Sequence, residues 1–382
     1  MPYDGPAVVT DWKLTITNKT ALIAVVVAFL AGMLATLAIR PPGEGSVSAA
    51  QNEEGVAVEV RWRVPVAFAT TLEVLGDNVI WVTDAIRRSS NGAIVLEPFE
   101  PGEVVPPLNI VDAVREGKVQ AGYTWLGYDQ GKIPASPLLG AVPFGMEPWE
   151  YTAWWFEAGG CELAEALYAK YDVHPLLCGL IGPETAGWFR SPIESLDDLE
   201  GLKIRFAGLG GKVIERLGAS VTMLPGGEIF QALEKGAIDA TEFSLPNVDE
   251  QLGFDRIAKL NYYPGWHQPY TAAHMVVNIE EWRALTAAQQ AVIDTACTGG
   301  VTRNLANSEA KQGPILAGFP AKGVTPIVLP EPILRQLNEV ADDVMAEEAA
   351  NDEDFRIIHE SQLAFRAQYA RWKRFAYLPR DF

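Results

Sequence analysis

An arginine interrupts a short apolar segment in the stretch GLKIRFAGLGG, residues 201–211. In a strand, Ile204 and Phe206 would face one side, and Lys203 and Arg205 the other. Arg205 comes directly before a run of glycines, so it lies near the strand's carboxyl end, where open α/β sheets bind their ligands. A guanidinium can donate two parallel hydrogen bonds to a carboxylate. The spacing alone is equally compatible with carboxylate binding and with an ordinary surface ion pair.

The glycines after Arg205 do not form a nucleotide-binding loop. Gly208 and Gly210 are followed by Val213, which breaks the GxGxxG frame, and no GxxxxGK[ST] occurs in the chain. The glycines more simply allow a strand end and the next helix N-terminus to approach a small ligand.

Other side chains could add charge to a ligand cleft at this strand end or line it. Glu242 ends the predicted strand AIDATEF, with Phe243 beside it. A carboxylate there could bind a cation or a ligand hydroxyl, although an exposed acid is commoner in an acidic chain. Trp125, Trp188 and Trp266 could wall the cleft, although buried tryptophans are more often plain core.

Catalytic patterns do not stand out. The sequence shows no Ser/His/Asp order, nucleophile elbow or paired-carboxylate motif, which disfavours an enzyme. His174, His267, His274 and His359 are scattered, without HxH or HExxH spacing. A histidine-based metal site therefore has little support from the sequence.

The three cysteines Cys161, Cys178 and Cys297 lack CxxC spacing, so they predict neither a disulfide framework nor a zinc site. Cys161 and Cys178 could pair in an oxidising compartment, but three separate thiols are the simpler expectation.

Net charge narrows the choice of partners. The chain of 382 residues carries a formal charge of −19, so its surface as a whole repels nucleic acid and anionic lipid. A bound anion must therefore be held by a local cation.

The N-terminus predicts export. Residues 21–39 are uncharged and apolar, and as a helix they would span about 28 Å, enough to cross a bilayer core. This length favours an uncleaved anchor, while the small residues at 46–50 leave a cleaved signal peptide open. Residues 40–55 are rich in Pro, Gly, Ser and acid and predict a flexible tether.

Strand and helix patterns alternate from Val56 onward, which predicts an α/β fold with a largely parallel sheet. Ser195 and Asp198 form a capping box for a short helix that stops at Gly201. The globular part exceeds what one core usually holds, so two lobes are expected. A long helical tail over 331–377 closes the chain.

Several motifs together resemble the solute receptors of tripartite ATP-independent periplasmic (TRAP) transporters, especially the branch that binds 2-oxo acids such as pyruvate. The match runs from about Trp62 to the C-terminus, and it rests on AVPFGM, GWFRSPIESLDDLEGLKIRFAGLGG, LPGGEIFQALEKGAIDATEF, GFDRIAKLNYYPGW and VVNIEEWRAL.

The resemblance implies a bilobed, periplasmic-binding-protein-like α/β fold, with two α/β domains joined by a hinge and long C-terminal helices. The expected division is an anchor and linker over 1–55, lobe 1 over 56–180 with part of 270–305, lobe 2 over 181–269 with part of 306–345, and a C-terminal helix over 346–382.

The resemblance also implies a binding site. Arg205 would hold the carboxylate of a 2-oxo or 2-hydroxy acid such as pyruvate or lactate. A bridging Na⁺ or Ca²⁺, with no organic cofactor, would be held by Glu184, Glu242, the Phe243 carbonyl and Gln268. Glu184 stands where the branch has glutamine, and Gln268 where it has an acid, so two carboxylates and one amide are kept. Glu184, Phe243 and the three tryptophans would line the ligand. At His267 the branch often has an aromatic residue, so this position could alter ligand selectivity.

The implied partners are the small four-helix and large twelve-helix membrane subunits of the transporter, with no nucleic acid. The chain would lie in the periplasm, tethered by residues 21–39 or secreted after signal cleavage.

The apolar residues of the tail recur at near-helical spacing: Leu363, Phe365, Tyr369, Trp372 and Phe375. In the branch such a helix can be exchanged between two protomers, so a homodimer and packing against the chain's own lobes are both open. Two other functions are also open: a sensory binding protein for another organic acid, and an exported enzyme that uses Glu184 or Glu242.

Overall fold

The computed structural model describes residues 57–378 of the chain. The fold is that of the unit Val56–Phe382.

Strands of the described residues form three sheets, in the orders β1-β2, β3-β10-β4 and β11-β9-β5-β8-β6-β7. Their bounds are β1 Val60–Pro65, β2 Ile94–Phe99, β3 Ala121–Thr124, β4 Val173–Ile181, β5 Gly187–Phe189, β6 Lys203–Arg205, β7 Ser220–Thr222, β8 Ala240–Thr241, β9 Leu260–Tyr263, β10 Thr271–Asn278 and β11 Thr325–Val328.

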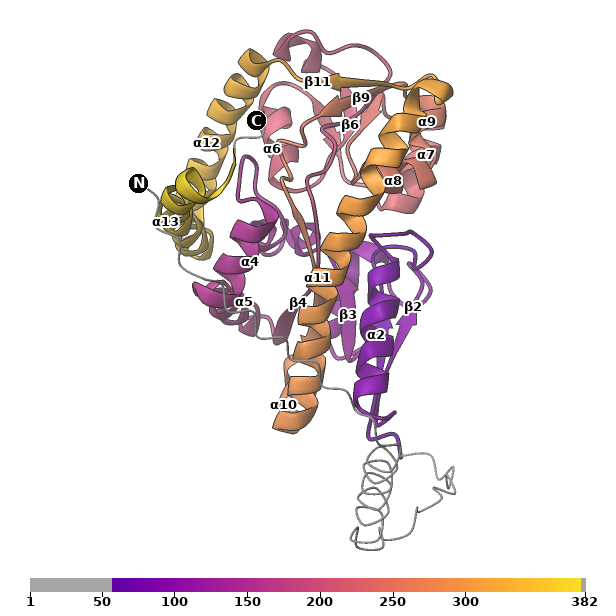
Figure 1. Cartoon of the computed structure of the whole chain (residues 1–382), viewed down its shortest axis with the longest axis vertical. Coiled ribbons are helices and arrows are strands. Elements are labelled where there is room, and N and C mark those ends of the chain that lie inside the picture. Colours follow the sequence, from indigo (N-terminus) through magenta and orange to yellow (C-terminus); the bar gives the residue numbers. More distant parts are fainter. Residues whose placement is uncertain (1–56, 379–382) are drawn as a thin grey trace, which may run out of the picture. The chain divides into compact units, whose positions relative to one another are not determined.

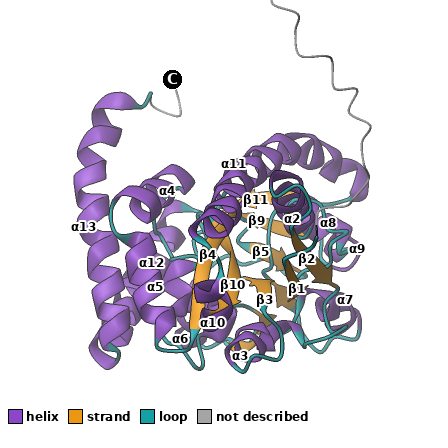
Figure 2. Cartoon of the chain, turned by 90° about the horizontal axis from the view of Figure 1, so that it is seen from below, coloured by secondary structure: helices purple, strands orange, loops and turns teal. Residues whose placement is uncertain are grey.

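Helices surround these sheets, as Figure 2 shows. Their bounds are α2 Asp77–Ser89, α3 Ile110–Arg115, α4 Pro148–Glu157, α5 Gly160–Ala169, α6 Gly208–Arg216, α7 Gly226–Glu234, α8 Pro246–Gln251, α9 Phe254–Ile257, α10 Ile279–Ala284, α11 Ala287–Gly318, α12 Glu331–Asn351 and α13 Glu353–Ala376.

Local sequence signals placed several of these elements well. The capping box of Ser195 and Asp198 is present at a short 3₁₀ turn, Leu196–Leu199. The predicted helical tail is two helices, α12 and α13, because Asp352 caps a new helix by accepting a hydrogen bond from the Phe355 amide.

The prediction of a largely parallel sheet is wrong for part of the fold. β10 pairs antiparallel with both β3 and β4, and β5 pairs antiparallel with β8 and β9. Each of these pairs joins segments far apart in sequence, whereas the local strand–helix–strand units, such as β6-α6-β7, are parallel.

The fold is bilobed. We call the part with β1–β4 and β10 lobe 1, and the part with the six-stranded sheet lobe 2. In Figure 1, α11 runs along both, and it contacts β4 and α2 of lobe 1 and α8 of lobe 2. The residue boundaries given for the lobes above stay predictions.

Two further chain segments cross between the lobes, and they are hydrogen-bonded to each other. One follows β4 and carries Glu184, and the other precedes β10 and carries Gln268. The Glu184 amide donates to the Gln268 carbonyl at 3.2 Å, and the Gly265 amide donates to the Glu184 carbonyl at 3.0 Å. These paired crossings fix Glu184 and Gln268 beside each other.

The expectation of three separate thiols is wrong, and so is the alternative pair of Cys161 with Cys178. Cys178 of β4 and Cys297 of α11 form a disulfide, and Cys161 is a free thiol. The two partners are 119 residues apart in sequence and meet because α11 packs on β4 in the core of lobe 1.

Within residues 57–378, no helix is both long and apolar enough to cross a bilayer. The predicted apolar segment 21–39 lies outside the described residues.

Candidate functional site

Arg205 lies at the end of β6 with its side chain turned inward, and only 1% of its surface is exposed. Its Nε donates to the Leu224 carbonyl at 3.1 Å, and its Nη1 donates to the Glu242 carbonyl at 2.8 Å. The guanidinium also stands over the ring of Phe243, 5.1 Å from the ring centre. Arg205 is therefore buried and hydrogen-bonded within the protein, and it does not form a surface ion pair.

Glu242 lies just after β8, the strand that pairs with β6, so the two adjacent strand ends bring it to Arg205. Its Oε2 accepts from Arg205 Nη1 at 2.9 Å and from the Ala207 amide, at the start of α6, at 3.1 Å. Burial acts to raise the pKa of Glu242, but the Arg205 charge and the neighbouring donors outweigh burial and hold the pKa below its ordinary value.

Glu184, on the crossing segment after β4, lies close to Arg205 and Glu242. The Thr271 hydroxyl donates to its Oε1 at 2.7 Å. Burial and the nearby Glu242 carboxylate raise the pKa of Glu184 well above its usual range. Without a further positive charge, this pair of carboxylates is therefore unfavourable in its ionised form.

Gln268 faces Glu184 at very short range. Its side-chain amide lies 2.5 Å from Glu184 Oε2 and 3.2 Å from Thr271 Oγ1. With nitrogen in that place, the amide donates to the carboxylate, and with oxygen there the two oxygens can share a cation. The amide of Gln268 can thus donate to Glu184 when no cation is bound and offer its oxygen to a cation when one is.

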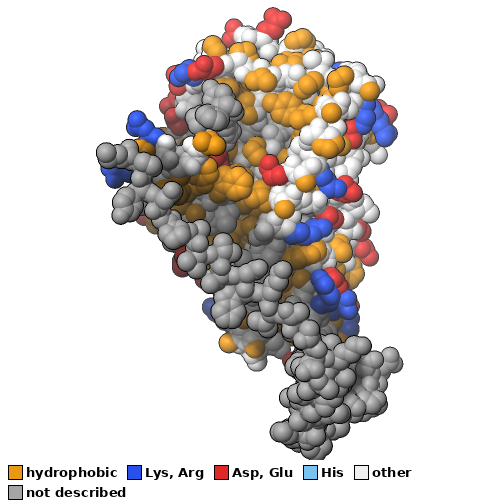
Figure 3. Space-filling model, viewed as in Figure 1, with side chains coloured by type: hydrophobic (Ala, Val, Ile, Leu, Met, Phe, Trp, Pro, Cys, Tyr) orange, Lys and Arg blue, Asp and Glu red, His pale blue; other side chains and the backbone are white. Residues whose placement is uncertain are grey.

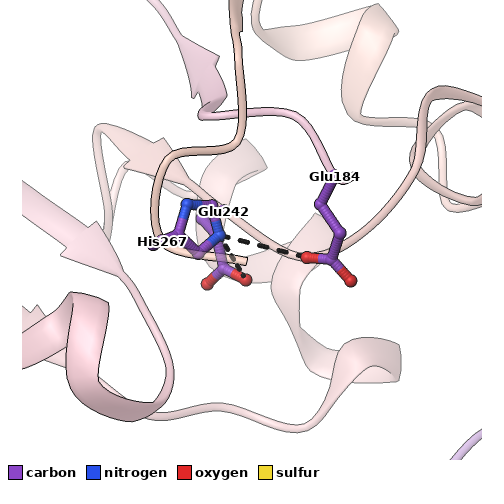
Figure 4. Close-up of side chains that lie close together, drawn as sticks. All are labelled: Glu184, Glu242 and His267. Atoms are coloured by element: carbon purple, nitrogen blue, oxygen red, sulfur yellow. Dashed lines mark ion pairs between the residues drawn. The ribbon is translucent and has the colours of Figure 1, made fainter. Parts of the chain in front are cut away.

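His267 completes the cluster, as Figure 4 shows. Its Nε2 lies 3.4 Å from Glu242 Oε1 and 3.9 Å from Glu184 Oε2. One ligand atom from each of the three residues can be chosen so that all lie within 4.8 Å of one another. The sequence spacing gave this histidine little support as a metal ligand. The resemblance marked it only as a position, next to Gln268, that could alter ligand selectivity.

Aromatic rings from both lobes pack around Phe243 and Tyr128, the rings nearest to the arginine. The rings of Phe68 and Phe243 are 6.3 Å apart, and Trp125 meets Tyr128 edge to face at 5.1 Å. Burial raises the pKa of Tyr128 to about 12, and the Arg205 charge is close enough to oppose that rise. The structure thus places Tyr128 and Phe243 beside Arg205, with Trp125 packed on Tyr128.

The glycines after Arg205 leave room for the side chains of Trp125 and His267. A Cβ on Gly208 would lie 2.7 Å from the Trp125 indole, and one on Gly210 would lie 2.6 Å from the His267 Cβ. Side chains at these positions would push both rings out of the site.

Trp188 lies outside this cluster, and Trp266 adjoins it at His267, whose ring it meets edge to face at 5.6 Å. The Trp188 indole donates to Asp249 Oδ2 at 2.8 Å and packs on Phe319, and Trp266 stacks on Phe144 at 5.7 Å. Asp249, which the sequence did not single out, also accepts from the Ser244 amide at 3.1 Å. Burial raises the pKa of Asp249 to about 8. It braces the chain that follows Glu242.

The arrangement suits binding of a small anion with the help of a cation. When both buried carboxylates are ionised, they outweigh the single guanidinium, so an anionic ligand beside them needs a further positive charge. The close oxygens of Glu184, Glu242 and Gln268 are the donors that such an ion requires. Among the described residues, the site shows no nucleophile paired with a base.

Known proteins similar to this chain point to the same chemistry. Residues 69–352 match the family described as bacterial extracellular solute-binding protein, family 7. A monocarboxylate 2-oxoacid-binding periplasmic protein of Nostoc sp. is 36% identical over 316 residues, which cover 82% of this chain and 86% of that protein.

Two crystal structures are also similar. A TRAP transporter solute-binding protein of Bordetella bronchiseptica, with copurified calcium and picolinate, has a TM-score of 0.81 and 31% identity over 83% of this chain and 94% of that one. A TRAP periplasmic solute-binding protein of Pseudoalteromonas atlantica, with bound sodium and pyruvate, has a TM-score of 0.80 and 30% identity over 83% and 97%. The chain therefore belongs to the family 7 extracellular solute-binding proteins, the periplasmic solute receptors of TRAP transporters.

Proposed function

We propose that this receptor binds a small 2-oxo or 2-hydroxy monocarboxylate, such as pyruvate or lactate, and catalyses no reaction. The observation that carries this proposal is the buried Arg205 beside Glu184 and Glu242. Arg205 donates to protein acceptors through Nε and Nη1, so the edge of the guanidinium near Tyr128 is the part we propose for a ligand carboxylate.

A cation would share this ligand with the protein. Glu184, Glu242, the Phe243 carbonyl and Gln268 are the groups we propose to hold it. Two similar proteins contain calcium with picolinate and sodium with pyruvate, which supports this proposal. When bound, the cation neutralises the two carboxylates and attracts the oxygens of the acid. Trp188 would support the site through Asp249, and Trp266 would support the segment that carries His267 and Gln268.

Calorimetric titration with pyruvate tests the role of Arg205. Arg205→Lys keeps the charge but loses the planar pair of donors, so we expect affinity to fall by about 10- to 100-fold, as for one lost charge-assisted hydrogen bond. Arg216→Lys, in the exposed pair with Glu347, is the matched control and should bind as wild type does. Equal affinity of Arg205→Lys and wild type would contradict the proposal.

The membrane side of the function follows from the family. We propose that the partners are a small four-helix and a large twelve-helix TRAP subunit, and that residues 21–39 tether the receptor to the inner membrane. Intact-mass measurement of the chain from a membrane fraction tests the tether, because signal cleavage would remove that segment.

A homodimer through α13 is the second part of the proposal. The middle of α13 is hydrogen-bonded to the segments before α4. Gln362 donates to the Leu138 carbonyl and Arg366 donates to the Phe144 carbonyl, both at 2.7 Å. Its end is not covered, because Phe375 is 85% and Trp372 is 61% exposed. Figure 3, drawn in the same view as Figure 1, shows apolar side chains across the middle and upper part of this face.

A further inference from the structure

The turn between β1 and α2 of lobe 1 has a strained backbone. Val74 is fully buried and has a φ of 80°, a conformation that a β-branched residue adopts only when its surroundings enforce it. Its amide donates to Asp77 Oδ1 at 2.8 Å, and its carbonyl accepts from the Asn304 side chain of α11 at 2.6 Å. These bonds fix the turn in place before lobe 2 contacts it.

The turn presents the main chain of Glu73 to lobe 2. The Glu73 amide donates to Gln251 Oε1 at 3.1 Å, and the Glu73 carbonyl accepts from Asn247 Nδ2 at 3.3 Å. Both partners belong to α8, which lies above α2 in Figure 1. Two hydrogen bonds thus join the lobes through a single residue.

Asn247 is only 3% exposed, and α11 sets its direction. Gln312 Nε2 donates to Asn247 Oδ1 at 2.8 Å, and the Asn247 amide donates to Gln312 Oε1 at 3.2 Å. The side-chain nitrogen of Asn247 is thereby left for Glu73. Gly313 and Pro314 follow directly, and the proline cannot donate to the carbonyl four residues earlier. The helix therefore lacks one backbone hydrogen bond just beyond this contact and is able to bend there.

Both sides of this contact continue into the ligand site. Before the turn, Phe68 of lobe 1 meets the ring of Phe243, which lies against the Arg205 guanidinium. After Phe243, Asp249 of α8 accepts a hydrogen bond from the next main-chain amide. A ligand that brings Phe68 and Phe243 together therefore also brings Glu73 to α8.

We propose that Glu73, Asn247 and Gln251 form a latch that holds the two lobes closed over the ligand, and that Asn247 and Gln251 set how slowly the ligand leaves. The ligand enters while the lobes are apart and the latch is unmade, so the latch acts on release and not on entry. The inference rests on the proposed function for its ligand and names the residues that retain it.

Stopped-flow measurement with pyruvate, followed by tryptophan fluorescence of the full chain, separates entry from release. Gln251→Ala removes the acceptor of the Glu73 amide, so we expect the dissociation rate to rise about 2- to 10-fold and the association rate to stay within about twofold. Glu250→Gln, whose side chain pairs with Lys322 in lobe 2, is the control on the same helix and should release pyruvate as wild type does. Equal dissociation rates for Gln251→Ala and wild type would overturn the proposal.

Hydrogen exchange at single amides separates the latch from the ligand class. In the chain without ligand, Gln251→Ala should speed exchange of the Glu73 amide about 2- to 10-fold. The Val74 amide, which donates to Asp77 within lobe 1, should exchange equally in both proteins. This result without any pyruvate binding would support the latch and count against the proposed function. Pyruvate binding with equal Glu73 exchange in both proteins would sink the latch and leave the receptor function standing.

Discussion

At the scale of single residues, buried charge decides what the site can do. Arg205, Glu184 and Glu242 come from three separate segments and meet with almost no exposed surface. The sequence identified these three because charged groups at strand ends and family motifs mark them. Asp249 was missed, and His267 was predicted only as a position that could alter ligand selectivity. Nothing local shows that Phe206 and Gly210 orient the imidazole, or that a buried carboxylate holds Trp188.

Asp129 offers a residue-scale test away from the ligand. It follows Trp125 in a 3₁₀ turn, and burial raises its pKa to about 7, while Lys132 opposes the rise. Between its unfolded pKa near 3.8 and its folded pKa, the unfolded chain has lost this proton and the folded chain keeps it. The contribution of Asp129 therefore destabilises the fold increasingly as pH rises through this window.

Urea unfolding at pH 5 and pH 8 measures the effect. Relative to wild type, Asp129→Asn should gain about 1–3 kcal/mol more unfolding free energy at pH 8 than at pH 5. Asp84→Asn is the control, because its exposed carboxylate pairs with Arg87 and Arg88, which lower its pKa out of this window. A difference between Asp129→Asn and wild type that does not vary with pH would refute the account.

At the scale of elements, short strands and glycine-started helices position the site. β6 and β8 bring Arg205 and Glu242 together, and α6 begins at Gly208 with a positive φ of 63°. The sequence predicted these elements because their capping and turn residues are local. The antiparallel pairs and the disulfide of Cys178 with Cys297 depend on distant segments, which local patterns do not encode.

Gly208→Ala tests how closely the two lobes fit. The added methyl group would lie within 2.7 Å of Trp125, across the cleft from α6. We expect pyruvate affinity to fall by at least about tenfold, because closure over the ligand would be hindered. Calorimetric titration of the variant with pyruvate measures this affinity.

Gly201→Ala is a closely matched control. Its φ of 73° carries the same left-handed strain, but a Cβ there meets nothing within 4 Å. It should lose about 1 kcal/mol of stability and keep wild-type affinity. If the two variants lose equal affinity, lobe contact at Gly208 is not what limits binding.

At the scale of the whole molecule, the question is what covers the end of α13. In Figure 2 this helix lies along one side, beside α4, α5 and α12. A cavity of about 880 Å³ opens between α13 and the loop before α4, lined among others by Phe144, Trp149 and Leu363. An exposed aromatic end next to an apolar cavity suits a second copy of the chain.

Light scattering after size exclusion checks the assembly. The double variant Trp372→Glu and Phe375→Glu should shift the receptor from dimer to monomer, because charges would have to be buried at the interface. Val328→Glu, at a comparably exposed apolar residue of lobe 2, should leave the dimer unchanged. A monomeric wild type at micromolar concentration would contradict the dimer.

The central claim, that this receptor takes a small 2-oxo acid through Arg205 and a cation, is tested most directly by calorimetric titration of the wild-type chain with pyruvate. Charge-assisted bonds of about 1.5–3 kcal/mol each, together with a cation, predict one saturable site per chain with micromolar or tighter affinity. Removal of bound metal should weaken that affinity markedly. No saturable binding of pyruvate or lactate, with or without added calcium or sodium, would contradict the account.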